Sequence, residues 1–387
     1  MSILQQVLSE LDIEPRDYQQ RLVSKTLGMY TSPFEDRFGR QRSPVDSVLI
    51  ESPTGSGKTV IALLAARCMQ QQYGVSVGWV AMRRNLLNQA ATENLKRGFN
   101  VDLKLISMFD RDPPKVDFLI VDEAQHDGAR SMASLHSRIR PKKLLGLTAT
   151  PFRSDKIKLC FEQVNRDVGI EQLIQGGYLS RFHHYTIPQY TPATVSETFL
   201  REQRRWGKSL LFFHRYQQCL ECRDLLATAG VHAEVVTAAS NREKQIQDFA
   251  AGKIPVLISM AILSEGFDCP SLRTVFCRPS GKGATIQMCG RVFRKDKRLK
   301  FKQVVQCGST RHPITKTATP TEQYCWMDGR WQSLKLNEKI AAISAHTLRL
   351  IADCRPQLPE YVIKNRGRVQ HIETPVSANH ATVATNG

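Results

Sequence analysis

Short apolar runs of strand length alternate with segments of helical periodicity along most of the chain. In the first half these runs are SVLIES, SVGWVAM, LKLIS, DFLIVDEA and LLGLTAT, and in the second half SLLFFH, AEVVT, PVLISM, TVFCRP and KQVVQC. Most of them are rich in β-branched residues, which is typical of strands buried on both faces of a sheet. Strand–helix alternation of this kind predicts an α/β fold with parallel sheets that are covered by helices on both faces.

The alternation occurs twice, so it predicts two α/β domains, at residues 1–185 and 201–310. The segment IPQYTPATVSETF is rich in Pro and Thr and has little periodicity, so we expect a linker at residues 186–200. The pattern then weakens, and residues 311–387 are expected to form an accessory tail. Within this tail we predict a small hairpin at Asp328-Gly329, one helix and a disordered end.

Composition and charge narrow the class of protein. No apolar run approaches the roughly 20 residues of a membrane span, and the first residues lack the basic region of a signal peptide, so we expect no membrane contact and a cytoplasmic location. Lys and Arg outnumber Asp and Glu by 54 to 36, which gives a net charge of +18. A positive field attracts polyanions, of which nucleic acid is the commonest in a cell. A soluble basic protein without this partner is the alternative.

Ten cysteines raise the question of a metal site. Cys219 and Cys222 have C-x-x-C spacing, but neither a second such pair nor a nearby His pair completes a tetrahedral site. Their segment has the pattern of an amphipathic helix, on which these two positions share a face. We therefore expect reduced, buried cysteines and assign no metal to them.

The segment ESPTGSGKT matches the end of the phosphate-binding pattern G-x-x-x-x-G-K-[ST], although Ser52 stands where the first glycine would be. Gly55 and Gly57 allow positive φ and bring backbone N–H groups close to phosphate. Lys58 would reach the β- and γ-phosphates, and the Thr59 hydroxyl would hold Mg²⁺. A predicted strand precedes the segment and a predicted helix follows it. The alternatives at this point are a chance turn, a small-molecule kinase and an ATP-driven motor.

Two further strand ends carry polar side chains. FLIVDEAQH places Asp122 and Glu123 at the end of an apolar strand, where a parallel sheet presents catalytic groups beside a phosphate loop. Asp122 would bind Mg²⁺, and Glu123 would orient and deprotonate the attacking water. LLGLTATPFR ends another strand with Thr148 and Thr150, for which a turn closed by proline is the simpler interpretation.

The segment QMCGRVFR in the second half places Gln287, Arg291 and Arg294 at i, i+4 and i+7, which predicts that they share one face of a helix. A solvated basic face is one interpretation. Because the segment is otherwise apolar, we favour arginines that point into an interface, as arginine fingers do.

Together these segments resemble the motifs of the superfamily 2 DEAD/DEAH-like helicases and translocases, in the family's order, over about residues 14–308. EPRDYQQ is similar to the adenine-recognising Q-type motif, and SPTGSGKT is similar to motif I, which often lacks the first glycine in this superfamily. The remaining matches, in order from motif Ia to motif VI, are VAMRRNLLNQ, VDEAQH, LTATP, LLFFHRYQQC, VLISMAILSEGFDCP and QMCGRVFR.

The resemblance implies two tandem RecA-like domains with ATP and Mg²⁺ in the cleft between them, and nucleic acid running across both domains opposite the cleft. The first domain would supply the nucleotide and Mg²⁺ ligands Arg16, Gln19, Thr54, Gly55, Ser56, Gly57, Lys58, Thr59, Asp122 and Glu123. The second would supply Gly266, Asp268, Gln287, Arg291 and Arg294. In this family ATP closes the cleft, and hydrolysis and release open it.

Within the superfamily, SEGFDCP, GYLSRF and QMCGRVFR resemble the DNA-directed group that contains RadD, UvsW, XPB and the motor subunits of restriction enzymes. Gln125 replaces the His that is usual at the fourth position of motif II in this group, a position that couples hydrolysis to work on nucleic acid, and His126 follows it. We therefore expect a DNA helicase or translocase that is a monomer or weak oligomer. The alternatives are an RNA helicase, the motor of a restriction system, and a non-hydrolysing nucleic-acid clamp.

Two features near the end of the resemblance add candidate contacts with nucleic acid. RKDKRLKFK, residues 294–302, has six cations and one acid and would neutralise phosphates, unless it is only a solvated loop. Trp326 and Trp331 could stack on bases, but such residues more often seal a small core.

Overall fold

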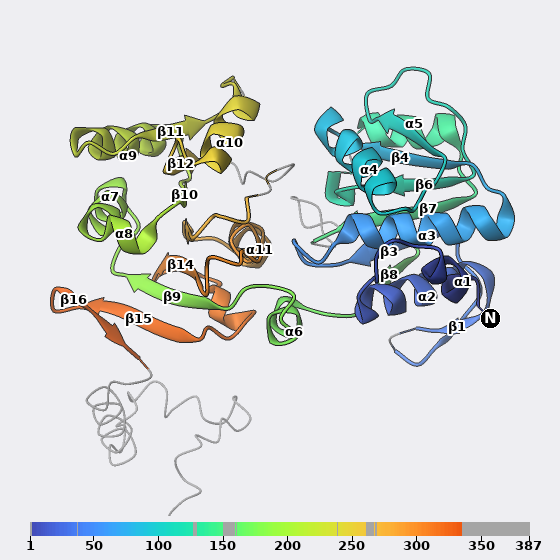
Figure 1. The fold of residues 1–387 in the computed structure, drawn as a ribbon, viewed down its shortest axis with the longest axis horizontal. Helices are drawn as coiled ribbons and strands as arrows, with labels where there is room; N and C mark the ends of the chain where they lie inside the picture. Colours follow the sequence, from blue (N-terminus) through green and yellow to red (C-terminus); the bar gives the residue numbers. More distant parts are fainter. Residues whose placement is uncertain are drawn as a thin grey trace, which may run out of the picture.

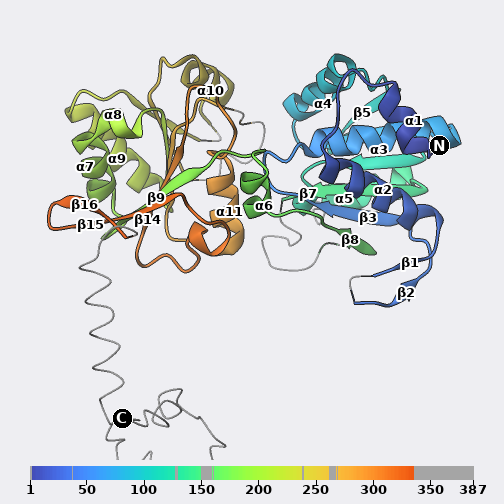
Figure 2. The same ribbon diagram turned by 60° about the horizontal axis from the view of Figure 1, so that its bottom comes forward.

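The computed structural model describes residues 2–36, 38–126, 130–149, 159, 161–237, 239–260, 267 and 269–334. They form two α/β domains that lie side by side along the longest axis of the molecule (Figure 1). Helix α6 (Ile170–Gln175) lies between the two domains, as the turned view of Figure 2 also shows. The predicted fold class of two tandem domains with mostly parallel sheets is confirmed.

The first domain contains a six-stranded parallel sheet in the order β5-β4-β6-β7-β3-β8. Its strands are β3 (Ser47–Glu51), β4 (Val77–Ala81), β5 (Leu103–Ser107), β6 (Phe118–Val121), β7 (Lys143–Thr148) and β8 (Gln163–Asn165). The helices are α1 (Ile3–Ser9), α2 (Asp17–Thr31), α3 (Lys58–Tyr73), α4 (Arg84–Lys96), η1 (Ala124–His126) and α5 (Arg130–Ile139). A small antiparallel ribbon consists of β1 (Phe34–Glu35) and β2 (Gln41–Arg42).

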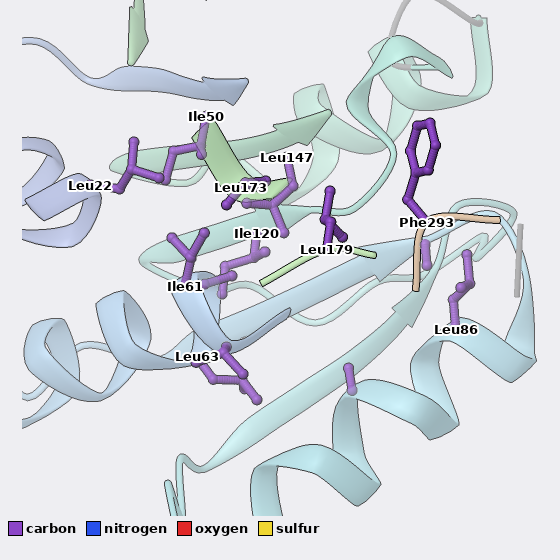
Figure 3. Packing of buried hydrophobic residues seen from close by; sticks show 14 of the residues in the cluster. Leu22, Ile50, Ile61, Leu63, Leu86, Ile120, Leu147, Leu173, Leu179 and Phe293 are labelled. Atoms are coloured by element: carbon purple, nitrogen blue, oxygen red, sulfur yellow. The ribbon is translucent and has the colours of Figure 1, made fainter. Parts of the chain in front are cut away.

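Both faces of this sheet are covered, as the unbroken apolar runs predicted. Because side chains alternate along a strand, Val48 and Ile50 of β3 pack with α1, α2 and α3, whereas Leu49 packs in a second cluster with Leu135 of α5. Figure 3 shows part of the first cluster, in which Leu22 and Ile61 project from helices towards the sheet.

The second domain contains an eight-stranded sheet in the order β11-β12-β10-β13-β14-β9-β15-β16, parallel except for the pair β15 and β16. Its strands are β9 (Phe182–Ile187), β10 (Ser209–Phe212), β11 (Ala233–Val236), β12 (Val256–Ser259), β13 (Thr274–Phe276), β14 (Lys302–Cys307), β15 (Glu322–Met327) and β16 (Arg330–Ser333). The helices are α7 (Pro192–Arg201), α8 (Gln203–Trp206), α9 (Tyr216–Thr228), α10 (Arg242–Ala251), α11 (Lys282–Gly290) and η2 (Ile314–Lys316). Helices α7 and α9 cover one face, and α10 and α11 the other.

The segment 186–200 is not the irregular linker that its composition predicted. Strand β9 pairs with β14 and β15 in the second sheet, so residues 182–185 belong with that sheet. Helix α7 follows, because the Thr191 hydroxyl accepts a hydrogen bond from the N–H of Thr194 at 3.1 Å and Pro192 occupies the first helical turn. Proline at this position favours the start of a helix.

The hairpin at Asp328-Gly329 is confirmed: these residues have φ of 50° and 72° and join β15 to β16. It does not stand apart as an accessory tail, because β15 extends the second sheet by pairing with β9. Trp331 packs against Trp206 with ring centroids 5.8 Å apart, and its indole N–H donates to Glu202 Oε2 at 2.6 Å. The expectation of a small sealed core is thus confirmed for Trp331, whereas the predicted tail helix lies outside the described residues.

Cys219 and Cys222 are fully buried between α9 and the sheet, as expected of small hydrophobic side chains. Burial raises the pKa of Cys219 to about 11 and that of Cys222 to about 12. Over the described ranges no cluster of three or more His, Cys, Asp or Glu side chains could hold a metal ion. No helix in this part of the chain is long and apolar enough to span a membrane.

The two domains are in direct contact. The segment that joins them is tied to the second domain, because the N–H of Ser180 donates to the carbonyl of Phe293 at 2.7 Å. Phe293 and Leu179 belong to the same hydrophobic cluster as the helices of the first domain (Figure 3). Gly290 packs so closely on Thr54 that a Cβ at this glycine would lie 3.0 Å from the Thr54 Cβ.

Candidate functional site

A cleft of about 590 Å³ lies where the two domains meet. Its lining from the first domain includes Arg16, Gln19, Thr54, Gly55, Gly57, Lys58, Thr59, Asp122 and Glu123. The second domain and the segment before it contribute Tyr178, Leu179, Phe267, Pro270, Arg291, Arg294 and Lys295. Three separate stretches of the sequence that were predicted to act together therefore border one cavity.

The phosphate loop runs from the end of β3 to the start of α3. Gly55 and Gly57 have φ of 83° and 79°, in the left-handed region that glycine adopts at least cost. A side chain at Gly57 would meet the Gln19 amide, since a Cβ there would lie 2.5 Å from Nε2. The loop therefore needs glycine at these two positions for conformation and for space.

Ser52, the residue at the place of the missing first glycine, has a structural role of its own. Its hydroxyl donates to the Ser56 hydroxyl at 2.6 Å across the loop, and both side chains are buried. Its N–H donates to the carbonyl of Thr148 at 2.9 Å, which ties the loop to β7. Positive φ is not found at position 52, so the chain does not need glycine there.

The start of α2 holds the phosphate loop from the other side. The Tyr18 hydroxyl and the Gln19 amide both donate to the carbonyl of Ser56, at 2.5 and 2.9 Å. The Gln19 carbonyl oxygen accepts from the N–H of Arg16 at 2.9 Å, which fixes the amide orientation. The Arg16 guanidinium lies 4.7 Å from the centroid of the Tyr178 ring. Tyr178 was missed by the sequence analysis, because its segment GYLSRF carries no pattern that assigns it a contact.

The two adjacent carboxylates follow β6 and border the cleft. Glu123 has φ of 52°, which is uncommon for a residue with a side chain, and its N–H donates to Asp122 Oδ1 at 2.9 Å. The Gln125 amide donates to Glu123 Oε2 at 2.8 Å, and its carbonyl oxygen accepts from the Thr148 hydroxyl at 2.8 Å. Gln125 thus bridges the acidic residue to the end of β7.

The arginine segment differs from its predicted helical arrangement. Helix α11 ends at Gly290, so Arg291 and Arg294 follow the helix and do not share a helix face with Gln287. Both arginines border the cleft, whereas Gln287 does not. Burial lowers the pKa of Arg294 to about 10. The last residue of the helix, Gly290, is also the residue that packs closely on Thr54.

The basic run 294–302 is only partly available to a ligand. Arg294 is half-buried at the cleft, and Lys295 borders it. Lys302 is buried in β14, where its ammonium donates to the carbonyls of Pro270 and Leu272 at 2.5 and 2.6 Å. Burial lowers the pKa of Lys302 to about 8. The prediction that the whole run neutralises phosphates was therefore wrong for Lys302, which serves the fold.

Three predicted residues cannot be placed in this arrangement. Gly266, Asp268 and Thr150 lie outside the described residues.

The residues of the cleft fit a nucleotide and its metal. Two positive-φ glycines leave the loop open to a phosphate group, and Lys58, Arg291 and Arg294 supply positive charge. The Thr59 hydroxyl and the Asp122 carboxylate border the same cavity and are the oxygen ligands that Mg²⁺ prefers.

Comparison with known families agrees with this geometry. The family described as "Type III restriction enzyme, res subunit" matches residues 12–108, and "Helicase conserved C-terminal domain" matches residues 191–296. The first match contains the phosphate loop, and the second contains the arginine segment. Two RecA-like domains with matches to these families indicate the family of helicase-like ATPase motors. The chain belongs to the superfamily 2 helicases.

Curated relatives are distant. The "51.5 kDa protein" of a Lactococcus phage is 23% identical over 267 residues, which cover 60% of this chain and 59% of that protein. "Putative ATP-dependent helicase IRC3" of Saccharomyces cerevisiae is 23% identical over 349 residues, which cover 72% of this chain and 49% of that protein. The chain therefore spans about half to three fifths of the length of these relatives.

Solved structures share the fold at low sequence identity. A fragment of a putative HsdR subunit of a type I restriction enzyme from Vibrio vulnificus has a TM-score of 0.61 at 15% identity, covering 84% of this chain and 72% of that one. The Type ISP restriction-modification enzyme LlaBIII bound to DNA has a TM-score of 0.55 at 14% identity, and the match covers 78% of this chain and 28% of that one. Dbp5 of S. cerevisiae bound to RNA and ADP BeF3 has a TM-score of 0.55 at 16% identity, and the match covers 84% of this chain and 93% of that one.

Proposed function

We propose that this protein is a nucleic-acid-dependent ATPase, and specifically a cytoplasmic DNA helicase or translocase. The observation that carries the proposal is the single cleft bordered by the phosphate loop, the Asp122–Glu123 pair and Arg291 and Arg294 of the other domain. A site divided between two domains links the state of the nucleotide to the distance between those domains.

Each residue of the cleft has a distinct role in this proposal. Lys58 and the loop N–H groups hold the β- and γ-phosphates of ATP, and Thr59 and Asp122 hold Mg²⁺. Bound ATP and Mg²⁺ supply the transferable phosphoryl group and the charge that activates it. Glu123 orients the attacking water and accepts its proton. Arg291 and Arg294 stabilise the negative charge that develops on the phosphoryl oxygens.

Adenine recognition is assigned to the start of α2. Gln19 and Arg16 border the cleft, and Gln19 is held by its bonds to Ser56 and to the backbone of Arg16. We place the adenine ring near Arg16 and Tyr178, where the guanidinium and the aromatic ring offer flat surfaces.

The net charge of +18 suits a polyanion, which DNA and RNA both are. DNA is favoured over RNA on two further grounds. The family that matches the first domain is described as a restriction-enzyme subunit. LlaBIII, which shares the fold, is described as bound to DNA. Dbp5, described as bound to RNA, also shares the fold, so an RNA helicase is the second candidate. The motor subunit of a restriction system is a third, since two matches are described as subunits of restriction enzymes.

The deciding experiment measures phosphate release with no polymer, single-stranded DNA, duplex DNA, forked DNA and RNA, each at two salt concentrations. We expect DNA to stimulate hydrolysis, and Lys58→Ala to abolish the stimulated rate. Greater stimulation by RNA would move the assignment to an RNA helicase. A Glu123→Gln variant with unchanged phosphate release would contradict the enzymatic proposal and favour a non-hydrolysing clamp. Stimulation by none of the polymers above the Lys58→Ala background would refute the motor.

A further inference from the structure

Three neighbouring parallel strands of the second domain each carry a basic residue shortly after their carboxyl ends. His214 follows β10, Arg278 follows β13 and His312 follows β14, and these strands are adjacent in the order β10-β13-β14. In open α/β sheets, ligands bind in the crevice outside the carboxyl ends of the strands. Because these three ends share one edge of the sheet, the three side chains are brought to the same part of the surface.

Arg278 is held in place by neutral groups alone. Its Nη1 contacts His214 Nδ1 at 2.9 Å and donates to the Ser280 hydroxyl at 3.0 Å. His214 Nε2 lies 2.9 Å from the carbonyl of Pro279, so Nε2 carries the proton and Nδ1 accepts from the arginine. Arg278 Nε is buried and has no hydrogen-bond partner among the described residues. The guanidinium is therefore positioned but its charge is not neutralised there.

Further cations lie near the two histidines. The pKa of His214 is lowered by burial, by Arg278 and by Arg215, and the pKa of His312 is lowered by burial, by Lys282 and by Lys316. We call this group the basic edge; its members are His214, Arg215, Arg278, Lys282, His312 and Lys316. None of the six forms an ion pair with any residue that the structure describes. Such a concentration of unneutralised positive charge indicates an anionic ligand.

The basic edge is separate from the nucleotide cleft. None of its six members borders the cleft, whereas Arg291 and Arg294 do. Helix α11 connects the two places: Lys282 is its first residue and Arg291 follows its last. At 1.5 Å per residue, the helix keeps them on the order of 12 Å apart. A ligand on the basic edge would therefore be a second anion, not the phosphates of ATP.

We propose that the basic edge binds consecutive phosphates of the nucleic-acid backbone, with Arg278 as the positioned donor and the lysines as mobile charges. This inference rests on the proposed function and adds four residues outside the motif segments, namely Arg278, Lys282, His312 and Lys316. A line of phosphates fits better than one phosphate, because the three strands spread the cations over about 10 Å at 4.8 Å per strand. A planar guanidinium pairs with two phosphate oxygens at once, which a lysine cannot do.

The test uses fluorescence anisotropy of labelled single-stranded DNA with the full chain at several salt concentrations. Lys282→Ala/Lys316→Ala should weaken binding on the order of tenfold and reduce the slope of log K against log salt by about 1.4, at 0.7 per neutralised phosphate. The matched control is Lys25→Ala/Lys104→Ala, which removes two exposed lysines of the first domain and should change neither quantity. Thermal melting of both variants checks folding.

Arg278→Lys separates geometry from charge. The variant keeps the positive charge but loses the guanidinium group that His214 and Ser280 hold. Binding of DNA should therefore weaken, while the salt slope stays nearly unchanged. If every variant has the same affinity for DNA and the same salt slope as the control, while the wild type binds DNA, the basic edge is not a binding site for phosphates. Failure of the wild type to bind any polymer would instead refute the proposed function. Tripolyphosphate is the second ligand tested: if the variants lose affinity for it but keep their affinity for DNA, the assignment to a polynucleotide is wrong.

Discussion

Replacing Gln125 with alanine tests whether the bridge between Glu123 and β7 matters for hydrolysis. Gln125 gives a 2.8 Å hydrogen bond to the Glu123 carboxylate and receives one of 2.8 Å from Thr148. Glu123 also has a positive φ, a conformation that persists only when its surroundings hold it. The variant should therefore let the carboxylate leave the position from which we propose that it orients water.

The expected loss follows from the bond that is removed. A hydrogen bond to a charged group contributes about 1.5–3 kcal/mol. If that energy is realised in the transition state, turnover should fall by about 10- to 100-fold, at 1.4 kcal/mol per factor of ten. The KM for ATP should change little, because Gln125 does not border the cleft. Steady-state phosphate release at saturating DNA measures both quantities.

Thr148→Val provides the matched comparison, since it removes only the far hydroxyl of the bridge. A neutral hydrogen bond contributes about 0.5–1.5 kcal/mol, so turnover should fall by about 2- to 10-fold. Because both changes act through Gln125, the double variant should be no slower than Gln125→Ala alone. Turnover of Gln125→Ala within twofold of wild type would refute the reasoning. Multiplicative losses in the double variant would show instead that Thr148 acts by another route.

Three further outcomes follow from the structure. Ser52→Ala should lower the free energy of unfolding by about 1 kcal/mol in urea titrations, because it leaves the buried Ser56 hydroxyl without its partner. Burial lowers the pKa of His184 to about 4 from an ordinary 6.5, so stability is complete above pH 6.5 and declines towards pH 4 as only the unfolded chain gains the proton. Between pH 7 and 4.5, wild type should lose about 2 kcal/mol more than His184→Gln, and equal losses would contradict this. Tyr178→Ala should raise the KM for ATP with a smaller effect on turnover, and an unchanged KM would remove Tyr178 from the adenine site.

Buried strands were predictable because an apolar run of that length has few other stable arrangements. Polar composition was less reliable: the Pro-rich segment 186–200 begins a helix, since Pro192 lies at the one turn where proline is favourable. Lys302 shows the same limit: the run KQVVQC predicted its strand, but nothing in the sequence reveals that its ammonium donates to two buried carbonyls. Local helix capping decided the first case, and tertiary contacts decided the second.

The candidate site was predictable where the chemistry lies within one segment, and less so where it depends on contacts between segments. The phosphate loop has a local pattern, and Gly55 and Gly57 adopt the predicted positive φ. Motif VI was predicted as one helix, but the helix ends at Gly290, the residue that packs on Thr54 of the other domain. Tyr178 reaches the cleft through the segment between the domains, and no periodicity signals such an approach.

The end of β7 emerges as the point where the two halves of the candidate reaction site are joined. The carbonyl of Thr148 accepts from the N–H of Ser52 in the phosphate loop, and its hydroxyl donates to Gln125. A displacement of β7 would therefore move the loop that holds phosphate and the bridge that holds Glu123 in the same direction. Histidine is usual at position 125 in the group that the sequence resembles, but a glutamine amide can donate to a carboxylate and accept from a hydroxyl at once, without depending on a protonation state. Gln125 thus forms a bridge between strand and carboxylate that does not titrate near neutral pH.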